Sequence, residues 1–386
     1  MKKSGDDVSL ALVGINGYGN QYLNHILDNR ESLGINLTGI IDPTAAQNER
    51  FDELQTAGYP IFNTLEEFYQ ERDAQVVTIS TPIHMHLPMS ETAALHHANV
   101  LCEKPLTATA AEAWQFRELE EQNHGVIAVG YQWSFSDAVQ ALKKDIMAGT
   151  LGAPKRLRTL CLWPRPLSYY RRNNWAGRKR TDNGVWVLDS PANNATAHFL
   201  HNMLYLLGEE TAASTFPESV EAKLYRANDI ENYDAAAIYV HTDCGAEVYF
   251  YTTHSVNQKK GPVSHFEFEK ADVYFDINKD SVFQAYFHDG QVKDYGNPNI
   301  NQLKKLDDVI LAARSGAKDV PCGVRAAMAQ TLCIDMVQTE NEINNVPPDK
   351  IRKEERPHGD NITWVEGMAE AFETAYNNCC LPEGIL

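Results

Sequence analysis

The first 130 residues alternate short apolar runs with amphipathic segments, and few folds accommodate such an alternation. It predicts five strands separated by four helices, with strands at 8–13, 37–41, 76–80, 99–103 and 126–130, and helices at 18–29, 45–57, 88–97 and 112–122. A strand, a helix and a second strand at this spacing form a β-α-β unit, and consecutive units build a parallel sheet. The pattern therefore predicts an N-terminal doubly wound α/β domain over residues 1–131.

The second part of the chain follows a different period. Residues 235–296 alternate apolar and polar positions in runs such as AAAIYVHT and AEVYFYTT, and turn signals such as Asp289-Gly290 separate the runs. A helix is predicted to begin near Pro191, and further helices from about Gln302. We therefore expect a second α+β domain over residues 132–386, with a mostly antiparallel open sheet and helices on one face.

Composition argues against several classes of protein. The net charge is −18, and an acidic surface repels nucleic-acid phosphates and anionic membranes. No run approaches about 20 apolar residues, so no membrane-spanning helix is expected. The first apolar run is short and leads into a glycine motif, which indicates a strand and not a secretion signal. The seven cysteines are scattered without a C-x-x-C pair, which indicates reduced thiols, a cytoplasmic protein and no metal site.

A glycine-rich turn follows the first predicted strand, in ALVGINGYGNQYL. Gly14, Asn16 and Gly19 have the spacing of a dinucleotide-binding turn, in which backbone N–H groups and a helix N-terminus hold a pyrophosphate. Asn16 stands where the middle glycine is expected, and Gly17 and Tyr18 complete the turn. Because asparagine tolerates a positive φ better than most residues, we expect the turn to persist in a weakened form. No G-K-[ST] follows, which argues against a nucleotide-triphosphate loop.

Asp42 ends the second predicted strand, 23 residues after Gly19. A carboxylate at this place accepts both hydroxyls of an adenosine ribose and repels a 2′-phosphate. The order of strand, turn, helix, strand and acid predicts NAD as the cofactor in preference to NADP. The predicted contacts from this segment are Gly14, Asn16, Gly17, Tyr18, Gly19 and Asp42.

Two further segments carry a resemblance to a known family. STPIHMHLPM contains Thr81-Pro82, His86 and Pro88, and VLCEKPLTAT contains Glu103-Lys104-Pro105 after the fourth predicted strand. A Thr-Pro-x-x-x-His-x-Pro stretch followed by Glu-Lys-Pro resembles the Gfo/Idh/MocA family of nicotinamide-dependent sugar and polyol oxidoreductases. The resemblance covers most of the chain and continues through GYQWSFSDAVQALKKDIMAGTLGAPKRLR, which is similar to the domain junction of that family.

The resemblance implies a Rossmann N-terminal domain that binds NAD, with Lys104 beside the nicotinamide and the reacting hydroxyl. It also places Thr81, Pro82, His86 and Glu103 around the cofactor. The proline after Lys104 restricts that lysine to extended backbone, and partial burial would lower its pKa, so we predict a general base or a hydroxyl-polarising donor. The alternative for Lys104 is a surface salt bridge with Glu103, and the alternative for His86 is a structural role.

The chain departs from the family pattern in the second domain. The family's Asp-x-Gly-x-His-x-x-Asp stretch corresponds to DSPANNAT, in which Asp189 matches the first Asp and Asn193 stands at the histidine. An amide cannot accept a proton at neutral pH, so one partner of the usual lysine–histidine arrangement is missing. We predict Asp189 and Asn193 as catalytic and substrate-binding residues, together with Lys104.

Three explanations of this departure stay open. Lys104 is itself the base while Asn193 orients the substrate, or another group replaces the histidine, or the chemistry differs from simple dehydrogenation. The candidate replacements are Asp189, Tyr169, Tyr170, His198 and His201. On a helix that begins near Pro191, His198 does not share a face with Asn193, which speaks against it.

A basic and aromatic loop at 163–183 precedes Asp189. Aromatic faces stack on sugar rings, and arginine or asparagine binds hydroxyls or an anionic group. We therefore predict Tyr170, Arg172 and Trp175 as substrate contacts. The alternative is a loop that pairs with the acidic surface of the protein itself or lies at a subunit contact.

Together these features predict an NAD-dependent oxidoreductase that takes hydride from a secondary hydroxyl of a sugar, polyol or glycoside, with Lys104 at that hydroxyl. Two alternatives stay open. One is a redox-neutral, glycoside-cleaving enzyme that reoxidises its own NADH, and the other is a non-catalytic NAD-binding regulatory protein. The free face of the open sheet predicts a homodimer or a homotetramer, as the family commonly forms. The sequence does not name the carbohydrate.

Overall fold

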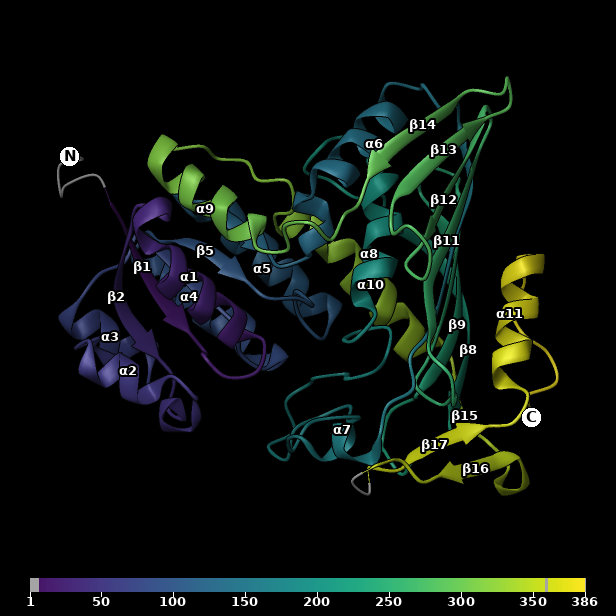
Figure 1. The fold of residues 1–386 in the computed structure, drawn as a ribbon, viewed down its shortest axis with the longest axis horizontal. Helices are drawn as coiled ribbons and strands as arrows, with labels where there is room; N and C mark the ends of the chain where they lie inside the picture. The colour runs from purple at the N-terminus through teal and green to yellow at the C-terminus, as the bar shows by residue number, and fades with distance from the viewer. Residues whose placement is uncertain (1–6, 358–359, 386) are drawn as a thin grey trace.

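The computed structural model describes residues 7–357 and 360–385. Two layered units stand side by side, one around a six-stranded sheet and one around a nine-stranded sheet (Figure 1). A third, two-stranded sheet lies near the C-terminus. No helix within these ranges is both long enough and apolar enough to cross a membrane.

The N-terminal unit is a doubly wound parallel sheet, as predicted. Its strands are β1 (Val8–Val13), β2 (Ile35–Ile41), β3 (Ile61–Phe62), β4 (Val76–Ile79), β5 (Asn99–Cys102) and β6 (Ile127–Val129). They lie in the order β3-β2-β1-β4-β5-β6, with every pairing parallel. The order reverses between β1 and β4, and ligands of such sheets bind at the carboxyl ends of the strands near this reversal.

Helices connect these strands. They are α1 (Gly19–Leu33), α2 (Phe51–Thr56), α3 (Leu65–Glu71), α4 (His86–Leu95) and α5 (Ala110–Gln122), with single turns η1 (Ala45–Gln47) and η2 (Ile83–Met85). The helix predicted at 45–57 is therefore divided between η1 and α2. The sequence prediction missed β3 and α3, because a two-residue, half-buried edge strand leaves no periodic pattern.

The second unit is a mixed sheet in which most neighbours are antiparallel. Its strands are β7 (Pro154–Leu162), β8 (Pro217–Arg226), β9 (Ala235–Thr242), β10 (Glu247–Thr253), β11 (Lys260–Phe268), β12 (Ala271–Asp276), β13 (Phe283–Phe287), β14 (Val292–Gly296) and β15 (Ile343–Asn345). Their order is β14-β13-β12-β11-β7-β10-β9-β8-β15, and only the pairs β7–β10 and β8–β15 are parallel. The predicted open antiparallel sheet is confirmed.

Helices α6 (Asp137–Met147), α8 (Ala197–Leu206) and α10 (Val324–Glu340) lie on the inner face of this sheet, between the two units (Figure 1). The turn η3 (Gln132–Phe135) leads into α6 from the first unit. The core is continuous across the units, because buried residues of both belong to one apolar cluster.

Helix α9 (Lys304–Ser315) returns from the second unit and packs on β1, β4 and β5. Its buried residues include Leu306, Val309 and Ile310. The predicted domain boundary at residue 131 stays a prediction. Helix α9, which lies far beyond that residue in the chain, nevertheless packs on the N-terminal sheet.

The outer face of the large sheet is partly covered by the chain itself. Helix α11 (Met368–Asn378) packs Met368 and Phe372 against Leu160, Leu162 and Tyr251 of the sheet. The hairpin of β16 (Ile351–Glu354) and β17 (Ile362–Val365) lies beside it, and η4 (Pro348–Lys350) precedes the hairpin. The sheet face expected to be free is therefore only partly free, and the oligomer stays a prediction.

The helix predicted to begin near Pro191 begins at Ala197 instead, so this prediction is wrong. Turns occupy residues 191–196, where Thr196 donates hydrogen bonds from its N–H and its Oγ1 to the Pro191 carbonyl, at 2.9 and 2.7 Å. Asparagine and threonine side chains compete with helical hydrogen bonds through such local contacts.

Candidate active site

The glycine turn is built for close backbone approach. Gly14 has a φ of +79°, and a Cβ at this position would lie 2.4 Å from the Ser80 carbonyl oxygen. A Cβ on Gly19 would lie 2.0 Å from the Gly14 oxygen. Both positions therefore require glycine. Because these two glycines allow the backbone to turn tightly, helix α1 starts close to the carboxyl end of β1.

Asn16 serves the turn in a way that the sequence prediction did not anticipate. Gly17 has a φ of +58°, and Asn16 is absent from the described residues with positive φ, so the reason expected for an asparagine here is wrong. Its Nδ2 instead donates to Asp42 Oδ2 at 3.3 Å and to the Thr44 carbonyl and hydroxyl at 3.1 Å each. The asparagine ties the turn to the loop after β2.

Asp42 lies at the end of β2 with a fully occupied carboxylate. Oδ2 accepts from the Ile15 N–H at 2.9 Å and from Asn16, and Oδ1 accepts from the N–H and the hydroxyl of Thr44 at 2.7 Å each. These donors fill about four acceptor positions, the capacity of a carboxylate. A ribose that binds Asp42 must therefore displace the Asn16 amide or the Thr44 hydroxyl.

Unpartnered groups at the turn fit a dinucleotide. The N–H groups of Asn16, Gly17 and Tyr18 have no acceptor among residues 7–357 and 360–385. The buried Thr81 Oγ1 also lacks a partner there, and its methyl carbon would lie 3.5 Å from a Cβ on Gly14. Consecutive N–H groups before a helix bind phosphate oxygens. These residues would hold the pyrophosphate of NAD.

His86 joins two loops around this site. Its ring is buried, with Nδ1 2.8 Å from the Pro105 oxygen and Nε2 3.0 Å from the Thr81 oxygen. Burial lowers its pKa. Since both ring nitrogens face carbonyl oxygens, His86 positions the Thr81-Pro82 loop against the Lys104-Pro105 loop. Its direct contact with the cofactor stays a prediction.

Glu103 pairs with a lysine that the sequence prediction missed. Its Oε1 accepts from the Tyr22 hydroxyl at 2.5 Å and from the ammonium of Lys305, whose side chain has no exposed surface. Lys305 also lies 3.3 Å from the Tyr18 hydroxyl and 3.3 Å from the Gly130 oxygen. Burial raises the pKa of Glu103, but Lys305, the Tyr22 hydroxyl and Lys104 together outweigh burial, so the pKa is lowered.

Lys305 carried a signal in the sequence. It lies on the buried face of α9 with Leu306, Val309 and Ile310. A lysine in the apolar stripe of an amphipathic helix requires a buried partner. Only the packing of α9 on β5 identifies that partner as Glu103.

Lys104 does not pair with the carboxylate of Glu103, so the surface salt-bridge alternative is wrong. Its Nζ donates to the backbone oxygen of Asn194 at 2.9 Å and lies 3.4 Å from Asn194 Oδ1. Burial lowers the pKa of Lys104 to about 8, although the charge of Glu103 acts in the opposite direction. A large fraction of this amine is therefore neutral at mildly alkaline pH.

Asp189 is connected to Lys104 through Asn194. Its Oδ1 accepts from Asn194 Nδ2 at 2.7 Å, its Oδ2 accepts from the Gly177 N–H at 2.6 Å, and Arg172 Nη2 lies 3.7 Å from Oδ2. Burial raises the pKa of Asp189, and Arg172 acts against this rise. The structure therefore joins Lys104, Asp189 and Arg172, three of the predicted residues, through Asn194.

Asn193 lies apart from this arrangement. Its side chain is fully buried, donates to the Leu188 oxygen at 3.2 Å and lies 3.4 Å from Gln330 Nε2. The side chain and backbone oxygens near Lys104 belong instead to the neighbour, Asn194. The catalytic assignment of Asn193 stays a prediction, with a side chain that points into the core.

His198 lies in the first turn of α8 because the helix begins late. Its ring packs edge-on against Tyr131 with centroids 5.7 Å apart, and its buried Nδ1 has no partner among the described residues. Burial and the charges of Lys104 and Lys305 hold its pKa well below the usual value. His201 instead stacks on Tyr131 at 3.8 Å, inside the core.

The predicted loop residues lie around Asp189. The Arg172 guanidinium lies 3.8 Å from the Tyr169 ring centre and 5.3 Å from that of Trp175. Trp175 packs against Ile83 of η2, which follows the Thr81-Pro82 loop. The Tyr170 hydroxyl is buried without a partner in the part of the chain that the structure describes. The short helix α7 (Leu167–Arg171) carries both tyrosines.

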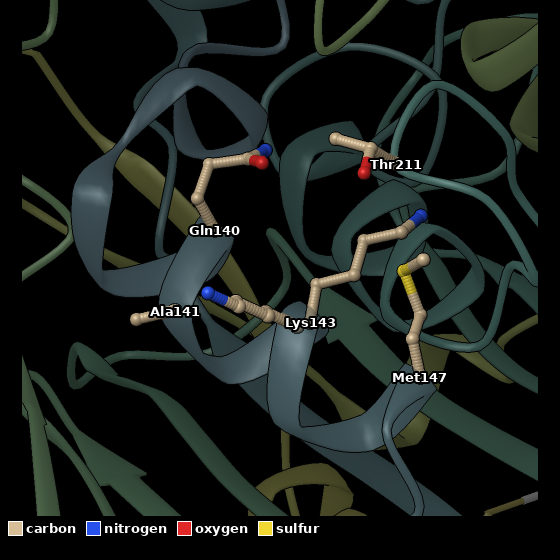
Figure 2. A pocket seen from close by; sticks show the side chains of 6 residues that line it. Gln140, Ala141, Lys143, Met147 and Thr211 are labelled. Carbon is tan, nitrogen blue, oxygen red and sulfur yellow. The ribbon is translucent and has the colours of Figure 1, made fainter.

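A cavity of about 390 Å³ lies on α6, and its lining does not include Lys104 (Figure 2). Lys143 reaches across it, with Nζ bonded to the carbonyls of Tyr205 and Ala213 and 3.7 Å from the Tyr205 ring centre. These contacts join α6 to the end of α8. We interpret Lys143 as a structural residue.

Family models match both units of the chain. Residues 8–131 match a model described as an oxidoreductase family with an NAD-binding Rossmann fold, and residues 139–274 match the GFO/IDH/MocA C-terminal domain. The chain belongs to the Gfo/Idh/MocA family. The prediction of this family is therefore confirmed, and NAD is the cofactor of its N-terminal fold.

Curated relatives of this Gfo/Idh/MocA chain resemble it over part of their length. The rhizopine catabolism protein MocA of Rhizobium meliloti is 28% identical over 36% of this chain and 43% of its own. An inositol 2-dehydrogenase of Leifsonia xyli is 30% identical over 36% of this chain and 41% of its own. The matched region thus spans about two fifths of these relatives.

Solved structures show the same fold over most of the chain. The WlbA dehydrogenase from Bordetella pertussis, in complex with NADH and UDP-GlcNAcA, has a TM-score of 0.68 at 18% identity, covering 87% of this chain and 98% of its own. A levoglucosan dehydrogenase, in complex with NADH and levoglucosan, has a TM-score of 0.70 at 16% identity, covering 86% and 96%.

Proposed function

We propose that this protein is an NAD-dependent oxidoreductase that oxidises a secondary alcohol of a sugar or polyol. One observation carries the proposal: a half-buried lysine without a carboxylate partner stands at the carboxyl end of β5, where the pKa of its amine is about 8. Two relatives, an inositol 2-dehydrogenase and the rhizopine catabolism protein MocA, support a sugar or polyol as the substrate.

The residues divide the work between cofactor and substrate. Asn16, Gly17, Tyr18 and Thr81 would hold the pyrophosphate, and Asp42 the adenosine ribose. NAD would supply the acceptor for a hydride. Lys104 in its neutral form accepts the hydroxyl proton at Nζ, because a pKa of about 8 leaves part of the amine neutral at about pH 7 to 8.

Asn194 and Asp189 act on Lys104 by positioning it. The Asn194 oxygens hold Nζ, and the Asp189 carboxylate holds the Asn194 amide at 2.7 Å. A lysine fixed in this way loses little entropy when it meets the substrate. Arg172 and Trp175 would contact the remainder of the carbohydrate.

His198 is a second candidate for the proton acceptor. Its low pKa keeps the imidazole neutral, and its Nδ1 lacks a partner in the described ranges. In that arrangement Lys104 donates a hydrogen bond to the substrate oxygen and the histidine removes the proton. The two assignments predict different pH profiles for Lys104→Met and His198→Asn.

We further propose a cytoplasmic homo-oligomer. All seven cysteines are free, which supports a reducing compartment. Tyr274 and Tyr286 are 44% and 45% exposed on the large sheet, and exposed aromatic residues on a sheet face favour a subunit contact.

The test is NADH absorbance at neutral and alkaline pH. Wild type, Lys104→Met and His198→Asn are mixed with NAD and a panel of sugars, polyols and glycosides, and products are analysed in the same tubes. NADH that forms with one compound and not with Lys104→Met supports the proposal. Glycoside cleavage without NADH supports a redox-neutral enzyme instead. NAD binding without any product would leave a non-catalytic protein.

A further inference from the structure

Two arginines beside the candidate site bring more positive charge than the surrounding residues neutralise. Arg165 forms no ion pair within residues 7–357 and 360–385, and its buried Nε lacks a hydrogen-bond partner there. Lys259, 5.2 Å from the Trp163 ring centre, also has no carboxylate partner in those ranges. In a chain with 52 acidic and 34 basic side chains, unpaired cations that gather in one place need a cause.

The carboxylate that faces Arg172 is already engaged. Asp189 accepts from the Gly177 N–H and from Asn194, and Arg172 lies 3.7 Å away, at the outer range of an ion pair. One negative charge therefore faces the positive charges of Lys104 and Arg172, while Arg165 has none.

Aromatic rings hold both guanidinium groups by their faces. The Tyr169 ring centre lies 3.8 Å from the Arg172 guanidinium carbon and 4.8 Å from that of Arg165. Trp163 adds a second ring, 5.8 Å from Arg165. A stacked guanidinium keeps the N–H groups on its edges available, in the geometry that binds a carboxylate or a phosphate through two hydrogen bonds.

The buried His254, which lies beside these groups, carries no charge. His254 Nδ1 lies 2.9 Å from the Trp163 carbonyl oxygen, and the ring packs 5.4 Å from that of Tyr169. Burial, Arg165 and Arg172 lower its pKa to about 3, so the ring is neutral. The local excess of positive charge comes from the arginines and Lys259.

We propose that the substrate carries an anionic group, a carboxylate or a phosphate, which Arg165 and Arg172 bind at a distance from the reacting hydroxyl. This inference rests on the proposed function, because it names the class of substrate for the same site. Both arginines lie on the predicted substrate loop. Arg172 is linked to Lys104 through Asp189 and Asn194, and Arg165 shares the Tyr169 ring with Arg172.

The test uses three probes that share one sugar ring: glucose, glucuronate and glucose 6-phosphate. Their binding to NAD-loaded protein is measured by calorimetry at low ionic strength. At least one anionic probe is expected to bind about tenfold or more tightly than glucose. Glucuronate and glucose 6-phosphate distinguish the two sources of negative charge.

Variants assign the effect to the arginines. Arg165→Gln and Arg172→Gln are each expected to weaken the anionic probe about tenfold and glucose less than about twofold. Arg325→Gln removes the same charge from an arginine that pairs with Glu210 and should leave all three probes unchanged. Arg165→Lys keeps the positive charge, and this variant is expected to keep part of the preference for anionic probes over glucose.

Three results would overturn this proposal. The three probes bind equally, or none binds at millimolar concentration, or the arginine variants lose affinity for glucose as much as for the anionic probes. The oxidoreductase assignment would survive if neutral carbohydrates still gave NADH. An arginine-dependent preference for anions without NADH from any compound would keep this inference and overturn the oxidoreductase assignment.

Discussion

The cofactor side and the substrate side of the candidate site satisfy their charges differently. On the cofactor side, Asp42 has its carboxylate filled by backbone and side-chain donors, and Glu103 pairs with Lys305. On the substrate side, Arg165 Nε and His198 Nδ1 have no hydrogen-bond partner among the described residues. Because an unpaired buried polar group costs free energy, it persists chiefly where a ligand supplies the partner.

This difference indicates that the charged side chains of the cofactor side find their partners as the protein folds, whereas those of the substrate side find theirs only with the ligand. Variants on the cofactor side should therefore change stability and NAD affinity. Variants on the substrate side should change turnover and leave the fold intact. The five predictions below test this division.

Lys104→Met is expected to have the largest effect, lowering turnover about 10²- to 10⁴-fold with unchanged circular dichroism, since it removes the proton acceptor. In the wild type, the rate of alcohol oxidation should rise as the pH rises through about 8, because the neutral amine is the active form. Lys104→Arg should be similarly slow, since its guanidinium stays charged. A wild-type rate for Lys104→Met would move the role to His198.

Lys305→Met is expected to destabilise the protein by about 3–5 kcal/mol, because it leaves the buried Glu103 carboxylate unpaired. Denaturant unfolding measures the change, and the double variant with Glu103→Gln should recover most of it. Lys304→Met is the matched control, because the half-exposed Lys304 pairs with Asp308 at 3.2 Å and should lose about 1 kcal/mol or less.

The pH dependence of unfolding checks the same pair. The folded-state pKa of Glu103 is lowered from 4.5, so its contribution is present above pH 4.5 and is lost as the pH falls through the folded-state pKa. Glu103→Gln should reduce this acid sensitivity. An unchanged acid transition in that variant would show that the pair does not contribute.

Asp42→Ala is expected to weaken NAD binding about 10- to 100-fold, since it removes charge-assisted hydrogen bonds to the ribose. It should also narrow the preference for NAD over NADP, because the repulsion of a 2′-phosphate disappears. Fluorescence titration with both dinucleotides measures the two effects. An unchanged preference would exclude Asp42 from the choice between them.

Asn16→Gly is expected to have the smallest effect, a rise in NAD affinity of about two- to fivefold. The Asn16 amide occupies Asp42 Oδ2 at 3.3 Å, so its removal frees one acceptor for the ribose. The gain should disappear in the Asp42→Ala background. Weaker binding by Asn16→Gly alone would show that the amide contacts the nucleotide directly.

Patterns local in the sequence predicted much of the fold. Strand and helix alternation identified the doubly wound sheet, and the period of two identified the antiparallel domain, including β9 at its observed bounds. The alternation missed β3, whose two residues carry no period. The prediction of a helix from Pro191 failed because side-chain hydrogen bonds to the local backbone replaced the helical ones.

The sequence by itself determined the glycine turn and the positions of Asp42 and Lys104. Each of them follows a strand of the parallel sheet, and the carboxyl ends of parallel strands meet at one edge. Only the tertiary structure brought Lys305 to Glu103, across 202 positions, and chose Asn194 instead of Asn193 as the contact of Lys104. Partners so distant in the chain meet through the packing of α9 and the late start of α8. No local period encodes which way a side chain points after an irregular turn.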